Sequence, residues 1–361
     1  MSLLPFAIVD PHIHQWDPYH TPHKAAVPVK LLGRFPRVLD GVAQAILPRA
    51  TLDMVGLTAN VLNPYQPADY VRDCGPHAVE AIVHIEADWH DHHGFGVVGE
   101  TRWVSGLPFG HGRPTLAGIV ATADPASPDF EQVLWAHRAA APQRFKGIRR
   151  MASHHADPGV HAFNPLPHLY TDADFLRGFG KLAEHGLRFD AWAYSTQLPD
   201  VTALASRFPE VPLVIDHLAT PVGVFGPVGR FTGRSASARE GIFSQWQDEL
   251  ADLAAVPHVQ AKLSGLLMPV LGVDFHKRHQ LASADTLVDL LAPFVEHAIN
   301  VFGCERLIWA SNFPMDKVTA ALPDIIEAYV RLVAPQGEAA LRKVFRENAL
   351  GFYGIGGSAG T

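Results

Sequence analysis

Ile8-Val9-Asp10-Pro11-His12-Ile13-His14-Gln15-Trp16-Asp17 is the stretch that decides the fold of this chain. It has the character of an apolar strand that ends in two histidines. Side chains at positions i and i+2 of a strand point to the same face, so His12 and His14 can converge where the strand stops. Two imidazoles at one spot can hold a metal ion or a substrate, although histidine is also common in loops and the chain has 21 of them. The stretch therefore predicts a first strand with a functional site at its carboxyl end.

Seven more short apolar runs follow and alternate with longer amphipathic stretches. The eight expected strands cover residues 6–9, 80–85, 116–122, 145–149, 187–192, 211–216, 259–263 and 306–310. Apolar residues at helical spacing predict helices over 172–185, 322–333 and 338–348, and the first of these stops at Gly186. The alternation predicts an α/β fold, a (β/α)8 TIM barrel with a parallel sheet.

The composition restricts the class of protein. A chain of 361 residues that is 48% hydrophobic can bury a large core, so we expect a single barrel domain over 1–361. The net charge of -7 favours a small-molecule substrate over a nucleic-acid or membrane partner. Only two cysteines occur, and neither a signal peptide nor an apolar span is evident, which favours the cytoplasm. A homo-oligomer is compatible with the sequence.

Two segments exceed what a minimal barrel needs. Residues 17–70, rich in proline and broken into short pieces, form an expected irregular insertion after the first strand. Residues 219–240 follow the sixth strand and carry four glycines and three arginines. Loops after barrel strands lie at the carboxyl-terminal mouth, so we expect 219–240 to fold over the mouth and help select the substrate. A surface loop without that role is the alternative.

The carboxyl ends of the expected strands are unusually polar. In a parallel barrel these ends converge on one mouth, and they therefore form one set. Any single member can be structural, as a helix cap or a rim ion pair, but charged groups at most of the ends favour a site. The set comprises His12, His14, His84, Glu86, Arg149, Arg150, Asp190, Asp216, His217, Lys262, Ser264, Ser311 and Asn312.

Four motifs of this set resemble the amidohydrolase-related family of TIM-barrel hydrolases, and most closely its sugar-acid lactonase and 2-pyrone-4,6-dicarboxylate lactonase branch. The resemblance runs from about residue 8 to residue 353. The motifs are His12-Ile13-His14 with Trp16-Asp17, Val214-Ile215-Asp216-His217-Leu218-Ala219-Thr220-Pro221, Val259-Gln260-Ala261-Lys262-Leu263-Ser264-Gly265, and Ile308-Trp309-Ala310-Ser311-Asn312-Phe313-Pro314.

The resemblance implies a metal-dependent hydrolase in which the first-strand histidines and a fifth-strand histidine hold one divalent metal such as zinc, with an eighth-strand aspartate as a further ligand or as the general base. This chain departs from that pattern twice, because its fifth strand offers Asp190 instead of histidine and its eighth strand presents Asn312. An amide is a poorer ligand than a carboxylate and cannot accept a proton from water. The enzyme is therefore expected to hold a metal weakly or to act without one.

Three residues can compensate for these departures. Asp190 can complete a metal site with His12 and His14, or form an ion pair at the rim. Asp316 can supply the missing carboxylate, or cap a helix. His217 can move the proton, because the ordinary pKa of histidine suits neutral catalysis, or it is a buried structural histidine. We favour His217.

Cationic and aromatic residues of the set are expected to bind the substrate. Successive strand residues face opposite ways, so one of Arg149 and Arg150 reaches the interior and clamps a carboxylate, while the other forms a rim ion pair. The phase of the strand leaves open which one. Lys262 stabilises an oxyanion or, more simply, pairs with a carboxylate such as Glu86 or Asp190. Trp16 and His84 complete the expected substrate-binding residues.

These residues predict a hydrolase that opens a lactone or similar cyclic ester of a small carboxylated or polyhydroxylated molecule. His12 and His14 are expected to polarise the carbonyl, directly or through a weakly held metal, with Asn312 beside them. The enzymatic alternative is non-oxidative decarboxylation of an aromatic or unsaturated acid, which normally needs the metal. The alternative of another class is a degenerate barrel that binds a ligand without turnover.

Overall fold

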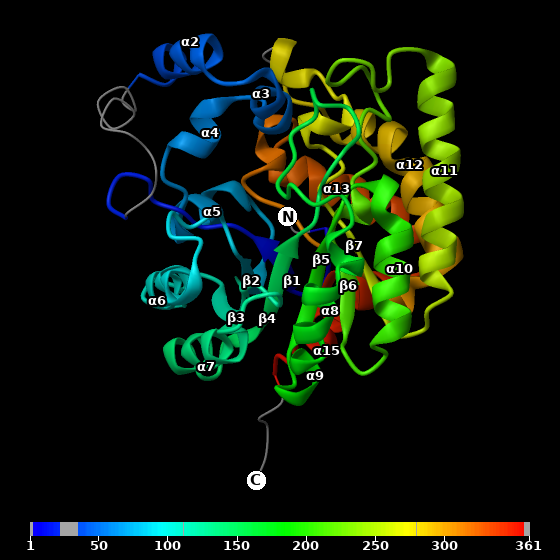
Figure 1. The fold of residues 1–361 in the computed structure, drawn as a ribbon. Coiled ribbons are helices and arrows are strands. Elements are labelled where there is room, and N and C mark those ends of the chain that lie inside the picture. Colours follow the sequence, from blue (N-terminus) through cyan, green and yellow to red (C-terminus); the bar gives the residue numbers. More distant parts are fainter. Residues whose placement is uncertain (1–2, 22–34, 111, 279, 357–361) are drawn as a thin grey trace.

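Eight parallel strands form one sheet in chain order from β1 to β8 in the computed structural model, which describes residues 3–21, 35–110, 112–278 and 280–356 (Figure 1). The strands are β1 Ile8–Ile13, β2 Val79–Ile85, β3 Thr115–Thr122, β4 Phe145–Met151, β5 Arg188–Trp192, β6 Leu213–Ile215, β7 Val259–Leu263 and β8 Leu307–Trp309. The sheet nearly closes on itself, because the Asn312 amide donates to the His12 carbonyl (2.9 Å) and the His14 amide donates to the Phe313 carbonyl (2.8 Å). The predicted (β/α)8 barrel is confirmed.

Helices follow the strands and cover the outside of the barrel (Figure 1). Local sequence explains several boundaries: the side chains of Asp172, Ser235 and Ser283 accept hydrogen bonds from amides in the first turns of α8, α11 and α12. The helices are α2 Pro36–Ile46, α3 Arg49–Val55, α4 Thr58–Leu62, α5 Pro67–Asp73, α6 Val98–Ser105, α7 Phe130–Ala140, α8 Ala173–Phe179, α9 Lys181–Glu184, α10 Leu198–Arg207, α11 Ala236–Ala254, α12 Ala284–Phe302, α13 Leu322–Val333, α14 Glu338–Arg342 and α15 Asn348–Tyr353.

Three boundaries expected from the sequence differ from those in the structure. The first strand continues to Ile13, so its histidines belong to the strand end itself. The helix expected over 172–185 divides into α8 and α9 at Gly180, and Gly186 follows with a φ of 62°. The helix expected over 338–348 is interrupted by a π-helical turn at Lys343–Glu347.

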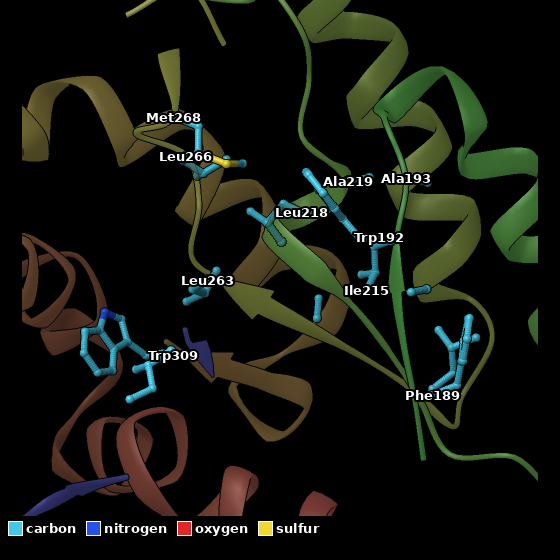
Figure 2. Packing of buried hydrophobic residues seen from close by; sticks show 14 of the residues in the cluster. Phe189, Trp192, Ala193, Ile215, Leu218, Ala219, Leu263, Leu266, Met268 and Trp309 are labelled. Carbon is cyan, nitrogen blue, oxygen red and sulfur yellow. The ribbon is translucent and has the colours of Figure 1, made fainter. Parts of the chain in front are cut away.

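Alternation along the strands sorts apolar side chains into two clusters. The larger one packs between the strands and the helices, and Figure 2 shows its members from Phe189 on β5 to Trp309 on β8. The smaller one contains strand residues of the other phase, such as Val83 and Val214, together with Phe352 and Tyr353 of α15. We interpret this cluster as the barrel interior, closed by α15 at the end opposite the mouth.

The insertion over 17–70 is more regular than the sequence suggested. Within its described part, helices α2 to α5 follow β1, and residues 22–34 lie outside the described residues. Figure 1 places α2, α3 and α4 above the carboxyl ends of the strands, so the insertion lies at the mouth. None of the helices in the described part of the chain is long and apolar enough to cross a membrane.

Candidate active site

A cavity of about 350 Å³ opens at the carboxyl ends of the strands. Its floor contains His14, Arg149, His217 and Asn312. Its walls come from α3, α4, the ends of β4 and β5, and the segments that follow β1, β2, β4, β7 and β8. This is where a TIM barrel places its active site. The volume suits a small ligand.

Three histidines meet at the cavity floor. The ring centroid of His12 lies 5.0 Å from that of His14 and 4.4 Å from that of His217. All three are buried, and His14 and His217 line the cavity. Burial, together with nearby positive charge, lowers the pKa of His14 to about 3 and lowers the pKa values of His12 and His217 well below the usual value. The imidazoles are therefore neutral at pH 7.

The tautomer of His14 follows from one hydrogen bond. Its Nδ1 lies 2.9 Å from the Ile85 carbonyl oxygen, which only accepts, so Nδ1 carries the proton. The neutral ring then presents a lone pair at Nε2. Nε2 suits a proton acceptor or a metal ligand. Direct polarisation of a substrate carbonyl, as expected from the sequence for His14, is not available to this tautomer, because that role needs a donor.

An unusual backbone turn presents His217. Residues 217–220 all have positive φ, from 41° to 61°, at a cost of about 1–2 kcal/mol each for L-residues. The turn places His217 Nδ1 2.8 Å from Ser264 Oγ. It also needs Gly265, because a Cβ there would lie 2.3 Å from the imidazole Cγ of His217. Strain of this kind is concentrated at functional sites.

The strand register decides between the two arginines. Arg149 pairs with Asp190 across β4 and β5 and is 5% exposed, while Arg150 points outward and contacts Asp124 at 3.3 Å. The Arg149 Nε and Nη2 atoms bind the Glu86 side chain (both 2.7 Å), and Nη2 also donates to the Glu86 carbonyl (2.8 Å). Most of the guanidinium is thus occupied by Glu86, and a bidentate clamp on a substrate carboxylate is not available.

Lys262 lies below the floor and is fully buried. Its Nζ is 2.6 Å from Asp190 Oδ2, 3.0 Å from Asp216 Oδ1 and 3.0 Å from His12 Nδ1. The Tyr353 hydroxyl also donates to Asp190 Oδ2 (2.6 Å). Lys262 therefore forms the ion pair expected with Asp190, and it does not line the cavity.

The described residues contain one group of three side chains with the donor set of a metal site. It is His12, Asp216 and His217, whose candidate ligand atoms lie within 4.8 Å of one another. The set expected from the sequence, His12 with His14 and Asp190, is not among the groups of described residues whose ligand atoms come this close together. This corrects the expected ligand set.

The charges around that group argue against a tightly held dication. Lys262 and Arg149 contact opposite sides of His12, at 3.0 Å from Nδ1 and 3.5 Å from Nε2. The same cations flank Asp216, at 3.0 Å from Oδ1 and 3.9 Å from Oδ2. A divalent metal bound here would lie beside two fixed positive charges. The group has the donor set of a metal site, but these two charges oppose a dication, so we expect it to hold one only weakly.

Asn312 adopts a left-handed conformation with a φ of 54° and lines the cavity. Its Nδ2 donates to Asp316 Oδ1 (3.0 Å). Burial raises the pKa of Asp316 to about 8. Asp316 lies outside the cavity lining, so it orients Asn312 and does not replace an eighth-strand carboxylate.

The remaining predicted residues divide between the cavity and the layer behind it. Trp16 lines the cavity, and its Nε1 donates to the Asn63 carbonyl (2.8 Å). His84 is fully buried behind the lining, 3.1 Å from Glu100 Oε1. Its expected contact with substrate is therefore corrected to a role behind the site.

The prediction of site residues missed Glu100 and Tyr353, because neither is at a strand end and only packing brings them to the barrel. Asp216 belongs to the polar set without an assigned role, and Glu86 was expected only as a possible partner of Lys262, whereas it binds Arg149. The Asp216-His217 pair at the sixth strand end was the available signal for the first of them.

Of the described residues that line the cavity, none comes from 219–240. That segment packs behind the loop after β4: the backbone amides of Arg230, Phe231 and Thr232 donate to the Asp157 carboxylate (2.7–3.1 Å). The same loop carries His161 and Phe163, which line the cavity.

An eight-stranded barrel with a histidine-lined cavity at the carboxyl ends of its strands defines a TIM-barrel enzyme. The chain belongs to the Amidohydrolase family, whose model matches residues 9–355, and it is a hydrolase of that superfamily. It is 28% identical to protein y4mH of Sinorhizobium fredii, over 97% of this chain and 99% of that protein. It is 27% identical to the L-fucono-1,5-lactonase of Burkholderia multivorans, over 77% and 88% of the two chains. An amidohydrolase structure from Burkholderia multivorans with bound zinc superposes with a TM-score of 0.68 at 21% identity, covering 97% and 100% of the chains, which supports the fold.

Proposed function

We propose that the protein hydrolyses a lactone or a similar cyclic ester. One observation carries the proposal: two neutral imidazoles, His14 and His217, share a small cavity with the fixed Arg149 guanidinium. Ester hydrolysis needs an acceptor for a proton of water and positive charge near the carbonyl oxygen. The lactonase relatives of the chain support the same reaction class.

Three of the floor residues have a defined role in this mechanism. Arg149 Nη1, which does not bind Glu86, stabilises the negative charge that develops on the carbonyl oxygen. His217 accepts a proton while the water oxygen bonds to the carbonyl carbon, and it returns that proton to the ring oxygen when the ring C–O bond breaks. His14 orients the water through its Nε2 lone pair. The product is the open hydroxy acid.

No step of this mechanism uses a metal, because Lys262 and Arg149 already supply positive charge on both sides of His12 and Asp216. Decarboxylation would require an anchored substrate carboxylate, and Arg149 is largely occupied by Glu86. The charge arrangement thus supports hydrolysis of an ester over loss of carbon dioxide.

A panel of lactones in weak buffer with a pH indicator tests the proposal, because each turnover releases acid. The double variant Arg149→Met/Glu86→Gln removes both buried charges together, and we expect it to lower kcat/KM by about 100-fold. Arg150→Met is the matched control on the same strand, and its kcat/KM should stay unchanged. Absence of acid release from every lactone, or equal activity of the double variant, would refute the proposal. Melting temperatures verify that each variant is folded.

A further inference from the structure

The methionines of this chain have an uneven distribution. The sequence contains five, and every methionine that the structure describes lines the one cavity: Met54, Met151, Met268 and Met315. They come from α3, the end of β4 and the segments after β7 and β8, so only the tertiary fold brings them together. Figure 2 shows Met268 in the segment beyond β7 and Trp192 at the end of β5. Methionine is flexible and polarisable, and it adapts to apolar ligands of varied shape.

Aromatic side chains extend this apolar wall. Phe163 and Trp192 lie 4.9 Å apart between ring centroids and both line the cavity. The indole nitrogens of Trp192 and Trp16 already donate hydrogen bonds within the protein. Trp192 Nε1 donates to Thr220 Oγ1 (3.0 Å), and Trp16 Nε1 donates to the Asn63 carbonyl (2.8 Å). Both rings therefore offer carbon surface to a ligand.

Besides the floor residues, the lining includes the polar side chains of Thr51, Asp88 and His161, and two of the floor groups have partners already. Asn312 Nδ2 donates to Asp316, and Arg149 is held by Glu86. A substrate with several hydroxyl groups would lose its hydrogen bonds to water against the methionine wall. Polyhydroxylation is therefore disfavoured.

The charges of the lining disfavour a carboxylated substrate. Among the lining residues that the structure describes, Arg149 is the only arginine or lysine, whereas Glu86 and Asp88 both contribute carboxylates. A substrate carboxylate would meet an already paired cation and two like charges.

We infer that the cavity accepts an uncharged lactone with an apolar alkyl or aryl substituent, the ester at the histidine floor and the substituent against the methionine wall. This inference rests on the proposed lactone hydrolysis, and it departs from the carboxylated or polyhydroxylated substrate expected from the sequence.

The test compares four lactones with the purified full chain: δ-valerolactone, δ-nonalactone with its butyl substituent, glucono-δ-lactone and 2-pyrone-4,6-dicarboxylate. We expect kcat/KM for δ-nonalactone to exceed that for unsubstituted δ-valerolactone about tenfold or more, and the other two to be poorer substrates than δ-nonalactone. Highest kcat/KM for the polyhydroxylated or the dicarboxylated lactone would overturn the inference and leave the proposed function intact.

Variants locate the effect on the methionine wall. Met54→Gln should lower kcat/KM for δ-nonalactone about tenfold and change δ-valerolactone much less, whereas Met54→Leu should keep the preference. Leu52→Gln is the control, because Leu52 lies on the same helix and does not line this cavity. Equal effects of Met54→Gln on both lactones would contradict the assignment.

A binding measurement separates this inference from the proposed function. Calorimetry with 6-butyl-2-piperidone, the lactam analogue of δ-nonalactone, and with a polyhydroxylated piperidone measures affinity without turnover. Binding of the butyl lactam with no hydrolysis of any lactone would refute the proposed function and support the inferred preference of the cavity for an uncharged ligand with an apolar substituent. Tighter binding of the polyhydroxylated lactam, or binding of neither, would overturn the inference.

Discussion

Replacing Lys262 by methionine should destabilise the protein through an uncompensated buried charge. The Lys262 ammonium is fully buried, 2.6 Å from Asp190 Oδ2 and 3.0 Å from Asp216 Oδ1. Burial raises the pKa of Asp190 to about 6, and the charge of Lys262 opposes that rise. Methionine keeps much of the volume of the lysine side chain but leaves Asp190 without its cation.

The expected loss follows from the cost of breaking a buried ion pair. Removing one partner costs about 3–5 kcal/mol. At about 2.1 cal/mol/K per residue, the 361 residues give an unfolding entropy of about 0.76 kcal/mol/K. Lys262→Met should therefore lower Tm by about 4–7 °C at pH 8, measured by differential scanning calorimetry.

The pH dependence of the Tm difference between Lys262→Met and the wild type distinguishes a loss of ion pairing from a packing defect. Without Lys262 the folded-state pKa of Asp190 rises further above its unfolded value, so the folded state holds a proton that the unfolded state has lost. The stability deficit is then full above the folded pKa and decreases as pH falls toward about 4. We expect a smaller Tm difference at pH 5 than at pH 8.

A double variant provides the control. Lys262→Met/Asp190→Asn removes both charges of the pair, and it should recover at least half of the lost Tm at pH 8. A Tm difference that is equal at pH 5 and pH 8, with no recovery in the double variant, would show that the loss is a packing defect and would refute the electrostatic reasoning.

Three further predictions concern the rim and the eighth strand. Because the pKa of Asp316 is raised to about 8, the stability of the protein should fall as pH rises from about 4 to about 8. The Tm of Asp316→Asn should therefore fall less than that of the wild type between about pH 6 and about pH 9. Parallel plots of Tm against pH for the two proteins would contradict this. Asn312→Asp should keep lactone turnover and raise the zinc content measured by elemental analysis after dialysis, since it adds a carboxylate; complete loss of turnover in a folded variant would show that the amide is needed. Asp157→Ala should raise KM more than it lowers kcat. The reason is that it removes the contact between 219–240 and the loop that carries His161 and Phe163. An unchanged KM would show that 219–240 has no influence on the cavity.

The sequence alone determined the architecture and the general position of the site. Apolar runs, helical spacing and glycine stops are local patterns, so they predicted all eight strands and the alternation that makes a barrel. The rule that strand ends converge then placed His14, His217 and Asn312 at one mouth, where the cavity lies.

Only the tertiary structure decided what each polar residue contacts. Strand register turned Arg149 inward and Arg150 outward, a choice that the alternation left open. Packing across the barrel brought Lys262 against Asp190, and it grouped His12 with Asp216 and His217 instead of with His14 and Asp190. The methionine wall also has no local signature, because its members are far apart in the chain. Such contacts depend on long-range geometry, and a sequence pattern records only which side chains are near in the chain.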